Sequence, residues 1–416
     1  MTSNSKIEIY KTSLGETFTW VPEELPYKCK NCKTRPAILN LPHYKTALCK
    51  ECFLEFFEKR VKRCIEQYKM FINAKRIGVF LSGGKDSSTL LIVLKKLYPE
   101  LYIQAIHVNL GIKYHSEEIE EFIKNFCESQ NVPLYFYNLL KEEGFSIDDF
   151  VFTQFKNKIC SVCGVIKRGI FSKIASKLEL DVVCTGHHLD DALSTMLNLF
   201  FQGSFDSIAR FSPVVPPLIN GQVKKVKPFF TTSEKEIFYY AILNNIPIKS
   251  FECPHTKKEK IPAKKYKEFL NYWEEKNPHF KHQTLSVFMK KLIPILKKVY
   301  NTKEEIVPCE KCGQPTSSKD KICTSCRRKE LILSLKKDLK DKLSLEISLD
   351  TAKQNHFKIF ELEEISPHIS TKKKLLKYFK PYKKEKIGII AKDLKQAYSL
   401  VLTLRKLGFE SYLLQS

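Results

Sequence analysis

The chain has 416 residues, 43% of them hydrophobic, and its 70 Lys and Arg against 46 Asp and Glu give a formal net charge of +24. This composition argues against global disorder and favours a polyanionic partner such as a nucleic acid, although a Lys-rich composition by itself would give the same surplus. Because no run of about 18 apolar residues occurs and residues 1–15 lack an apolar signal stretch, we expect no membrane-spanning helix and a cytoplasmic location.

The first motif is a double cysteine pair, Cys29/Cys32 and Cys49/Cys52, in a chain with 14 cysteines. Two C-x2-C pairs can bring four thiolates to the corners of a tetrahedron, as structural zinc sites require. The alternative is a set of unmetallated thiols. Residues 53–75 then follow the pattern of an amphipathic helix.

From Arg76 to about Glu252, apolar runs typical of buried parallel strands alternate with helical segments. This alternation predicts an α/β fold with a doubly wound parallel sheet. The expected strands are Ile77–Leu81, Tyr102–Val108, Leu134–Tyr137 and Val182–Thr185, and the expected helices are Ser88–Leu97, Ser116–Ser129 and Lys167–Leu178.

A phosphate loop is expected directly after the first of these strands. The segment is Ser82-Gly83-Gly84-Lys85-Asp86-Ser87, and a helix follows at once. Its glycines allow close approach of an anion, the helix N-terminus offers free N–H groups, and Ser82, Ser87 and Lys85 add donors and charge. The spacing is not that of a Walker A loop. The alternative is an ordinary glycine turn.

A third group of cysteines is less defined. Cys160 and Cys163 form a lone C-x-x-C expected just before the helix at Lys167, and Cys253 stands alone. The pair is consistent with a redox dithiol, half of a metal site or chance, and Cys253 could join it. Three thiolates would leave one iron of a cubane cluster open to a substrate atom. Cys64, Cys127 and Cys184 are expected in the core.

Residues 254–300 are basic and mostly helical by pattern, and Cys309, Cys312, Cys323 and Cys326 repeat the four-cysteine zinc arrangement. The tail is expected to begin with a charged helix and to end in a strand, a helix and a strand, at Ile387–Ala391, Leu394–Leu407 and Glu410–Leu414. The expected domains are a zinc module with its helix, a catalytic α/β domain, a basic helical segment, a zinc ribbon and an accessory α/β tail, at residues 1–75, 76–252, 253–308, 309–328 and 329–416 respectively.

Taken in order, these motifs resemble the TtuA branch of the tRNA 2-thiolation enzymes, which carry a PP-loop of the form SGGxDS and are close to the eukaryotic wobble-uridine thiolases. The resemblance covers roughly residues 27–328. Besides both zinc sets and Ser82–Ser87, it rests on Ile159–Gly164 followed by Lys167-Arg168, Thr185–Asp191, Lys227–Phe229, Glu234–Glu236 and Glu252-Cys253-Pro254.

The resemblance implies an ATP-dependent tRNA-uridine 2-sulfurtransferase that adenylates the C2 oxygen of a uridine and replaces it with sulfur. Cys160, Cys163 and Cys253 match three ligands of a [4Fe–4S] cluster, and Lys167 and Asp191 match an essential lysine and aspartate. Lys167 could stabilise charge on the adenylated intermediate, and Asp191 could bind Mg²⁺, take part in proton transfer or only satisfy a helix N-terminus. The expected catalytic residues are Lys167, Asp191, Cys160 and Cys163, and the expected ATP-binding residues are Ser82, Gly83, Gly84, Lys85, Asp86, Ser87, Phe80, His107 and Gly186.

The same resemblance implies tRNA and a ubiquitin-like sulfur carrier with a C-terminal thiocarboxylate as partners, and we also expect a homodimer. Residues 163–168 and 246–254 favour the T-loop 5-methyluridine at position 54 as the target. The four-cysteine N-terminal set favours the wobble uridine at position 34.

Two positions depart from the family pattern, which usually has Asn where His188 stands and often Glu where Ala192 stands. Either change could alter Mg²⁺ or nucleotide contacts. The rival interpretations are another PP-loop enzyme, such as a lysidine or GMP synthetase, and a zinc-stabilised tRNA-binding scaffold with an inactive loop.

Overall fold

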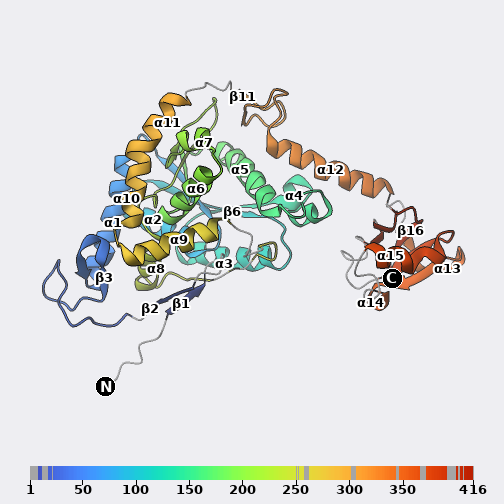
Figure 1. Ribbon diagram of the computed structural model, residues 1–416, viewed down its shortest axis with the longest axis horizontal. Helices are drawn as coiled ribbons and strands as arrows, with labels where there is room; N and C mark the ends of the chain where they lie inside the picture. The colour runs from blue at the N-terminus through green and yellow to red at the C-terminus, as the bar shows by residue number, and fades with distance from the viewer. Residues whose placement is uncertain are drawn as a thin grey trace, which may run out of the picture. The chain divides into compact units, whose positions relative to one another are not determined.

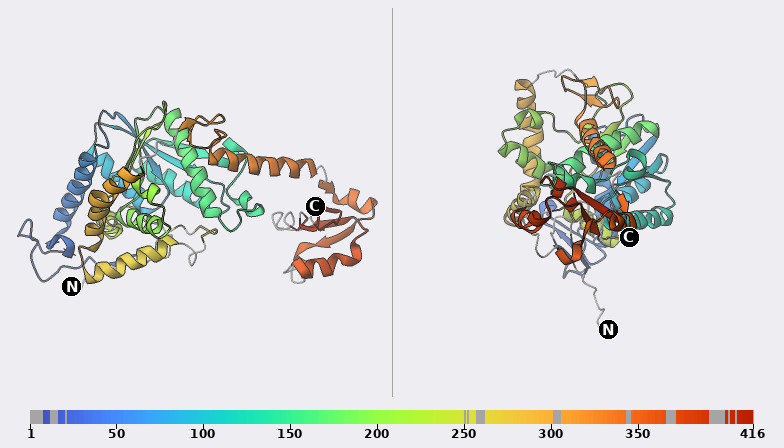
Figure 2. Two further views of the ribbon diagram at one scale, coloured as in Figure 1. Left: turned by 45° about the horizontal axis from the view of Figure 1, so that its top comes forward. Right: turned by 90° about the vertical axis from the view of Figure 1, so that its right-hand side faces the viewer.

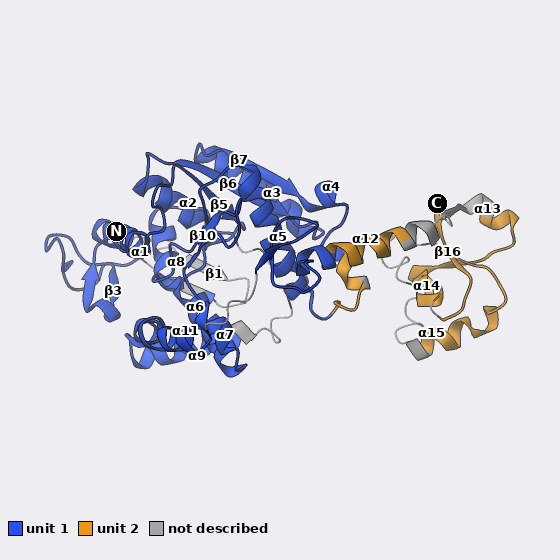
Figure 3. Cartoon of the chain, turned by 90° about the horizontal axis from the view of Figure 1, so that it is seen from above, with its two compact units in different colours: residues 1–148, 157–328 blue, residues 149–156, 329–416 orange. Residues whose placement is uncertain are grey.

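The computed structural model describes residues 8–11, 17–20, 22–249, 251, 253–256, 262–300, 306–342, 346–365, 372–390, 400, 401, 403–405 and 407–415. The chain divides into two compact units (Figure 3). Unit 1 comprises residues 1–148 and 157–328, and unit 2 comprises residues 149–156 and 329–416.

The centre of unit 1 is a six-stranded sheet in the order β7-β6-β5-β8-β10-β9 (Figure 1). All neighbours are parallel except β9, which is antiparallel to β10. The expected doubly wound α/β fold is therefore confirmed. The strands are β5 (Arg76–Leu81), β6 (Tyr102–Asn109), β7 (Leu134–Asn138), β8 (Val182–Cys184), β9 (Val214–Val215) and β10 (Lys224–Val226).

Helices connect these strands in crossovers that run in opposite directions from β5. The crossovers from β5 to β6 and from β6 to β7 run toward one edge, whereas those from β7 to β8 and from β8 to β10 run toward the other. Because parallel crossovers are right-handed, the two sets of helices cover opposite faces of the sheet. The helices of these crossovers are α2 (Lys85–Leu97), α3 (His115–Ser129), α4 (Leu139–Glu143), α5 (Ile159–Lys177), α6 (Leu189–Phe201) and α7 (Phe205–Ala209).

The N-terminal part of unit 1 contains two hairpins and a long helix. The elements are β1 (Glu8–Lys11), β2 (Thr17–Trp20), β3 (Leu39–Leu41), η1 (Pro42–Tyr44), β4 (Thr46–Leu48) and α1 (Lys50–Gln67). Phe53, Phe57 and Val61 of α1 are fully buried and share one helical face. The helix ends at Gln67, earlier than expected, since Lys69 has a positive φ of 51° that no helix residue adopts.

The basic segment after the sheet is helical, as expected. It contains α9 (Pro262–Lys276), α10 (Phe280–Val287), the π-helical turn η4 (Phe288–Leu292) and α11 (Ile293–Val299). The helix α8 (Glu234–Leu243) precedes this segment and lies within the expected catalytic domain. The widened turn lies just before Pro294. Proline has no N–H to donate, and its ring clashes with the carbonyl of the residue four positions earlier in a regular α-helix. The unit ends in a short ribbon, β11 (Val307–Pro308) and β12 (Pro315–Thr316), from which α12 (Thr324–Lys342) starts.

Unit 2 has its own four-stranded parallel sheet in the order β13-β16-β15-β14 (orange to red in Figure 2). Two of its strands, β13 and β14, were not expected. Residues 394–399, 402 and 406 of the expected final helix, and residue 391 of the strand expected before it, lie outside the described part. Its elements are η2 (Asp148–Phe152, whose first residue belongs to unit 1), β13 (Glu346–Ser348), α13 (Leu349–Gln354), β14 (Lys358–Glu361), α14 (Leu362–Ile365), α15 (Lys372–Phe379), η6 (Lys380–Tyr382), β15 (Ile387–Ile390) and β16 (Ser411–Gln415). In the described residues, no helix combines the length and apolar character needed to cross a membrane.

Candidate active site

The strand order locates the candidate site. The crossovers diverge between β5 and β8, and in open α/β sheets ligands bind at such a point, beyond the carboxyl ends of the strands. A pocket of about 600 Å³ lies there and is lined by residues from both strand ends. Its volume falls within the range of about 300–1,000 Å³ that is common for small-molecule sites.

The phosphate loop forms one wall of this pocket. Gly83 has φ of +84°, and a Cβ there would lie 2.9 Å from Ile119, so both conformation and space require glycine. The N–H of Ser82 donates to the Ser87 hydroxyl at 3.1 Å, and this hydroxyl donates to the carbonyl of Gly84 at 3.0 Å. These bonds hold the loop in a tight curve at the N-terminus of α2, which favours anions.

A second glycine brings the loop after β8 against the phosphate loop. A Cβ on Gly186 would lie 2.9 Å from the backbone nitrogen of Ser87 and 3.0 Å from the carbonyl carbon of Asp86. Backbone atoms cannot give way as a flexible side chain can. Gly186 is therefore required for the contact between the two loops that form the pocket.

Lys85 does not lie where a phosphate-binding lysine was expected. Its side chain is 1% exposed, and its ammonium contacts Asp86 Oδ1 and Glu234 Oε1, each at 2.8 Å. Lys85 is absent from the pocket lining, whereas Ser82, Gly84, Asp86 and Ser87 are part of it. Its charge thus neutralises carboxylates behind the loop.

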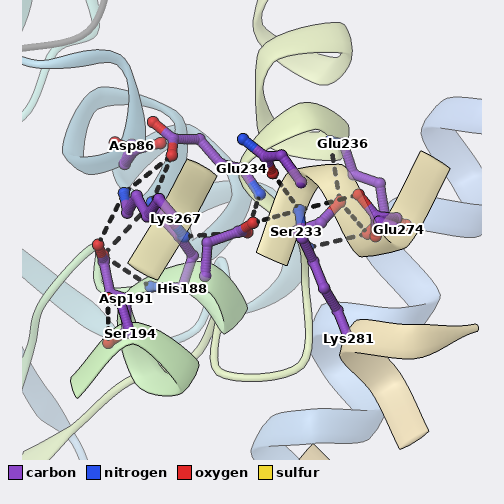
Figure 4. Close-up of polar contacts among 12 residues, drawn as sticks. Asp86, His188, Asp191, Ser194, Ser233, Glu234, Glu236, Lys267, Glu274 and Lys281 are labelled. Atoms are coloured by element: carbon purple, nitrogen blue, oxygen red, sulfur yellow. Dashed lines mark hydrogen bonds and ion pairs between the residues drawn. The ribbon is translucent and has the colours of Figure 1, made fainter. Parts of the chain in front are cut away.

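A network of charged side chains extends from Lys85 to the basic helices. Figure 4 shows the part that includes Glu234, Lys267 and Lys281. Lys267 of α9 reaches Glu234 Oε2 at 2.9 Å and Asp191 Oδ1 at 3.0 Å. Lys281 of α10 reaches Asp190 Oδ1 at 2.6 Å and Glu274 Oε2 at 2.8 Å. Charges this deeply buried are tolerated only when paired.

His188, one of the two departures from the family pattern, lies inside this network. Its Nε2 is 3.3 Å from Asp191 Oδ2 and 3.6 Å from Glu234 Oε2. Burial alone lowers the pKa of His188, but Asp191 and Glu234 outweigh burial and raise the pKa to about 9. Burial raises the pKa of Asp191, but His188 and Lys267 outweigh it and hold the pKa well below the usual range. Both groups are therefore charged at neutral pH.

The second departure has a smaller consequence. Ala192 is buried at 5% exposed, and its N–H donates to the His188 carbonyl within the first turn of α6.

Cys160 and Cys163 were expected just before a helix. They lie instead in the first turns of α5, which starts at Ile159. The helix begins early because Ile159, Val162, Ile166 and Ile170 form a continuous buried stripe at helical spacing.

Two cysteines and the expected lysine therefore share one helical face. Spacings of three and four residues place Cys160, Cys163 and Lys167 on the same side of α5. All three line the pocket, together with Cys253 from the loop after α8. Burial raises the pKa of both Cys160 and Cys163.

A further part of the pocket is aromatic. Phe80 of β5 stacks on Phe171 of α5 with ring centroids 3.6 Å apart, and His107 of β6 lies nearby in the lining. His107 Nδ1 is 3.0 Å from the carbonyl oxygen of Leu81, which can only accept, so Nδ1 carries the proton. Burial lowers the pKa of His107, so the ring is neutral and its Nε2 is a buried acceptor without a partner.

The two four-cysteine sets each converge. In each set the four sulfur atoms lie within 4.8 Å of one another. The Cys32–Cys49 separation is 3.9 Å and the Cys312–Cys323 separation is 3.6 Å. A tetrahedral zinc with Zn–S bonds of about 2.3 Å requires S–S separations of roughly 3.8 Å. Each set therefore fits one zinc ion. Cys64, Cys127 and Cys184 are buried elsewhere in the core.

Sequence reasoning missed several residues of the pocket. Glu234 appears in a motif of the resemblance, but nothing near it indicated that it would pair with Lys85 and Lys267. Lys267 carried no local signal at all. His255, whose Nε2 is 2.5 Å from Asp148 Oδ1, and Lys249 also line the pocket.

Comparisons with known proteins agree with this arrangement. Residues 54–250 match the PP-loop domain family, and residues 28–54 match the N-terminal LIM domain of 2-thiouridine synthetase TtuA. The chain is 35% identical over 321 residues to a tRNA-5-methyluridine(54) 2-sulfurtransferase of Pyrococcus horikoshii, covering 76% of this chain and 97% of that relative. It is 30% identical over 233 residues to cytoplasmic tRNA 2-thiolation protein 1 of Xenopus laevis, covering 55% and 68%.

A solved structure shares the fold. It is the U34-tRNA thiolase NcsA from Methanococcus maripaludis with its [4Fe-4S] cluster, with a TM-score of 0.61 and 22% identity over 74% of this chain and 97% of that chain.

Proposed function

The chain belongs to the family of PP-loop tRNA 2-sulfurtransferases, and from that premise we propose that it converts the 5-methyluridine at position 54 of tRNA to its 2-thio form. The observation that carries the proposal is the common pocket: the phosphate loop, Lys167, Asp191 and three cysteines line one cavity. The reaction would cleave ATP between its α and β phosphates. The uridine C2 oxygen would bond to the α-phosphorus and later leave with AMP as sulfur takes its place on C2.

ATP would bind with its phosphates against Ser82–Ser87 and its base near Phe80 and His107. The free N–H groups at the start of α2 suit the phosphates. The unpartnered Nε2 of His107 can accept a hydrogen bond from an adenine amino group.

Lys167 and Asp191 would act on the reacting atoms. Lys167 is positioned to stabilise negative charge that develops on the adenylated uridine. Since the pKa of Asp191 is held far below its usual range, this carboxylate is a poor general base. Binding Mg²⁺ together with the ATP phosphates is therefore the better role for Asp191.

Cys160, Cys163 and Cys253 fit a [4Fe–4S] cluster better than a single metal ion. The three cysteines line the same pocket. Their sulfur atoms, however, do not form one of the sets of ligand atoms that all lie within 4.8 Å of one another in the described residues. A cubane is larger than one ion and accepts this wider spacing. When bound, such a cluster would supply an iron able to take up sulfur. The alternative is a persulfide on Cys160 or Cys163, loaded by a sulfane-sulfur donor in place of the thiocarboxylate. Its outer sulfur would pass to C2 as the other cysteine forms a disulfide, which an external thiol would then reduce.

The zinc ions would be structural, because both four-cysteine sets are closed. The partners in this proposal are tRNA, a ubiquitin-like carrier with a C-terminal thiocarboxylate, and a second copy of the chain. Relatives named for the cytoplasm support a cytoplasmic reaction.

A second target, the wobble uridine at position 34, is favoured by the four-cysteine N-terminal set and by the relatives of the cytoplasmic 2-thiolation type. Mass spectrometry of tRNA from a deletion strain separates the two targets. Loss of 2-thio-5-methyluridine at position 54 is expected, and loss of thiolation only at position 34 would assign the alternative.

Anaerobic purification tests the cluster. We expect a brown protein with about four iron per chain whose colour bleaches in air. Replacing any one of Cys160, Cys163 or Cys253 with Ser should remove colour and thiolation together. Iron-free protein that thiolates tRNA at the full rate would support the persulfide instead.

A further inference from the structure

Unit 2 carries an unusual concentration of positive charge. Residues 372–386 include eight lysines and a single acidic residue, Glu385. Within α15, Leu375 and Phe379 are buried in the unit 2 core, whereas Lys374 and Lys377 are exposed, as is Lys380 directly after the helix. The helix is thus anchored by one face and presents lysines on the other.

The lysines continue beyond α15 along one edge of the sheet. Lys383 and Lys384 are exposed in the turn between η6 and β15, and Lys386 immediately precedes β15. Lys358 begins the neighbouring strand β14, and its N–H donates to the carbonyl of Lys386 at 2.8 Å. We call Lys358, Lys377, Lys380, Lys383, Lys384 and Lys386 the amino-edge lysines, because they lie on α15, on the segment that leads from α15 into β15, or at the first residue of β14.

Few of these charges are neutralised. Lys386 lies 3.9 Å from Glu410, a long ion pair between two exposed side chains. Lys377, Lys380, Lys383 and Lys384 have no ion pair with any residue in the described part of the chain. A cluster of unpaired like charges destabilises the fold by mutual repulsion, so it is best explained by a partner of opposite charge.

The opposite edge of the same strand is acidic. Glu361 ends β14, and Glu363 and Glu364 follow it, all three exposed. The carboxyl edge is where a parallel sheet ordinarily binds small ligands, and here it would repel a phosphate. The charge pattern of unit 2 therefore favours an extended anion lying across the amino edge.

We propose that the amino-edge lysines dock the sugar–phosphate backbone of tRNA, which makes unit 2 a tRNA-docking module of the enzyme. The inference rests on the proposed function, which makes tRNA the substrate. The Pyrococcus horikoshii relative matches 76% of this chain over 97% of its own length, so this chain has about a quarter that the relative lacks. A tethered second contact raises the effective concentration of the substrate at the pocket.

An anionic membrane fits the surface less well. Surface-binding helices insert apolar side chains beneath the headgroups. Leu376 is the one large apolar side chain of unit 2 that is exposed among its described residues, at 39%. A phosphate backbone requires charge alone.

The test compares two full-length variants with the wild type. K377A/K380A/K383A/K384A removes four unpaired charges, and K377R/K380R/K383R/K384R retains them. Binding of an unmodified tRNA transcript is measured by fluorescence anisotropy between 50 and 300 mM salt. Hydrogen exchange across β14–β16 confirms that unit 2 is folded in both variants.

We expect the alanine variant to bind tRNA at least tenfold more weakly at low salt. Its slope of log Kd against log salt should be smaller by up to about 3.6, since each of four phosphate contacts contributes roughly 0.9. The arginine variant should match the wild type. Unchanged affinity and slope in the alanine variant, or an equal loss in the arginine variant, would overturn the proposal.

Two further measurements separate this inference from others. If the alanine variant loses binding to vesicles containing 30% phosphatidylserine but not to tRNA, a membrane replaces tRNA as the partner. Binding is measured without ATP or sulfur donor. Loss of tRNA affinity in a chain that never thiolates therefore sustains the docking proposal and rejects only the proposed function.

Discussion

At the scale of single residues, the candidate site depends on a lysine that is far from the phosphate loop in the sequence but shares a carboxylate with it in the fold. Lys85 is buried on Asp86 and Glu234, so Lys267 is the ammonium that reaches the pocket beside Asp191. Because Lys267 contacts both Asp191 and Glu234, we infer that it fixes the positions of these two carboxylates beside the nucleotide site.

Replacing Lys267 with Ala should therefore impair the reaction without unfolding the chain. Removing one partner of a buried charge pair costs about 2–5 kcal/mol, and each 1.4 kcal/mol is a factor of ten. We expect kcat/KM for ATP to fall by about 30- to 4,000-fold, with partial rescue in K267R. ATP-dependent release of pyrophosphate with tRNA present is the measurement.

The control for this variant lies on the same helix. Lys265 of α9 is exposed, so K265A removes the same charge from α9 but leaves Asp191 and Glu234 paired. Equal losses in K265A and K267A would mean that the charge of α9, and not the contact in the pocket, matters.

At the scale of elements, the N-terminal module should depend on the zinc ion that we propose for it. The sulfur atoms of Cys29, Cys32, Cys49 and Cys52 converge at zinc spacing, and structural zinc contributes directly to folding. The C29S/C32S variant should lose about one of two zinc ions per chain and unfold at lower temperature. Metal analysis and calorimetry measure both, and C64S, which alters a buried cysteine of α1 outside the set, should retain both zinc ions.

A junction of α1, α8 and α10 should make the fold sensitive to acid. Arg60 of α1 bonds Glu236 of α8 and lies 3.3 Å from His282 Nε2 of α10. Burial, assisted by Arg60, lowers the pKa of His282 to about 4, even though Glu236 acts in the opposite direction. The unfolded chain, with an ordinary histidine pKa near about 6.5, binds this proton first as the pH falls.

Stability should therefore decrease as pH falls from about 6.5 to about 4, by on the order of 2–3 kcal/mol from His282. The pKa of Glu236 is also held below its usual range, which adds to the loss in the same direction. The H282Q variant should show a smaller decrease in the unfolding free energy of unit 1 between pH 7 and 4.5. H356N, at an exposed histidine of unit 2, should follow the wild type, and identical acid limbs for H282Q and wild type would contradict the assignment.

Local pattern predicted much of this fold but little of the charge network. The four central strands and the phosphate loop follow from apolar runs and glycines that lie together in the sequence. Strand β10 was missed because only Val226 of its three residues is buried. The start of α5 was predicted too late, because the C-x-x-C motif was treated as a loop although the buried Ile159 and Val162 of the helix lie within the same segment. The pairing of Lys267 with Asp191 spans 76 positions, and no local pattern encodes such a contact.

At the scale of the whole molecule, each of the two units has its own hydrophobic core among the described residues. The core of unit 1 gathers around the central sheet, and that of unit 2 includes Phe379, Ile387, Ile389 and Leu404. Because each unit buries its own apolar residues, a single free energy of unfolding does not describe the chain.

We therefore expect two transitions in calorimetry, which one core substitution in each unit should distinguish. Leu404 and Leu193 are both 0% exposed, and truncating such a leucine to Ala costs about 2–5 kcal/mol. L404A should lower only the transition of unit 2 and leave the affinity for ATP unchanged, whereas L193A, in α6 behind Asp191, should lower the other. A single transition that both variants shift equally would show that the units unfold together.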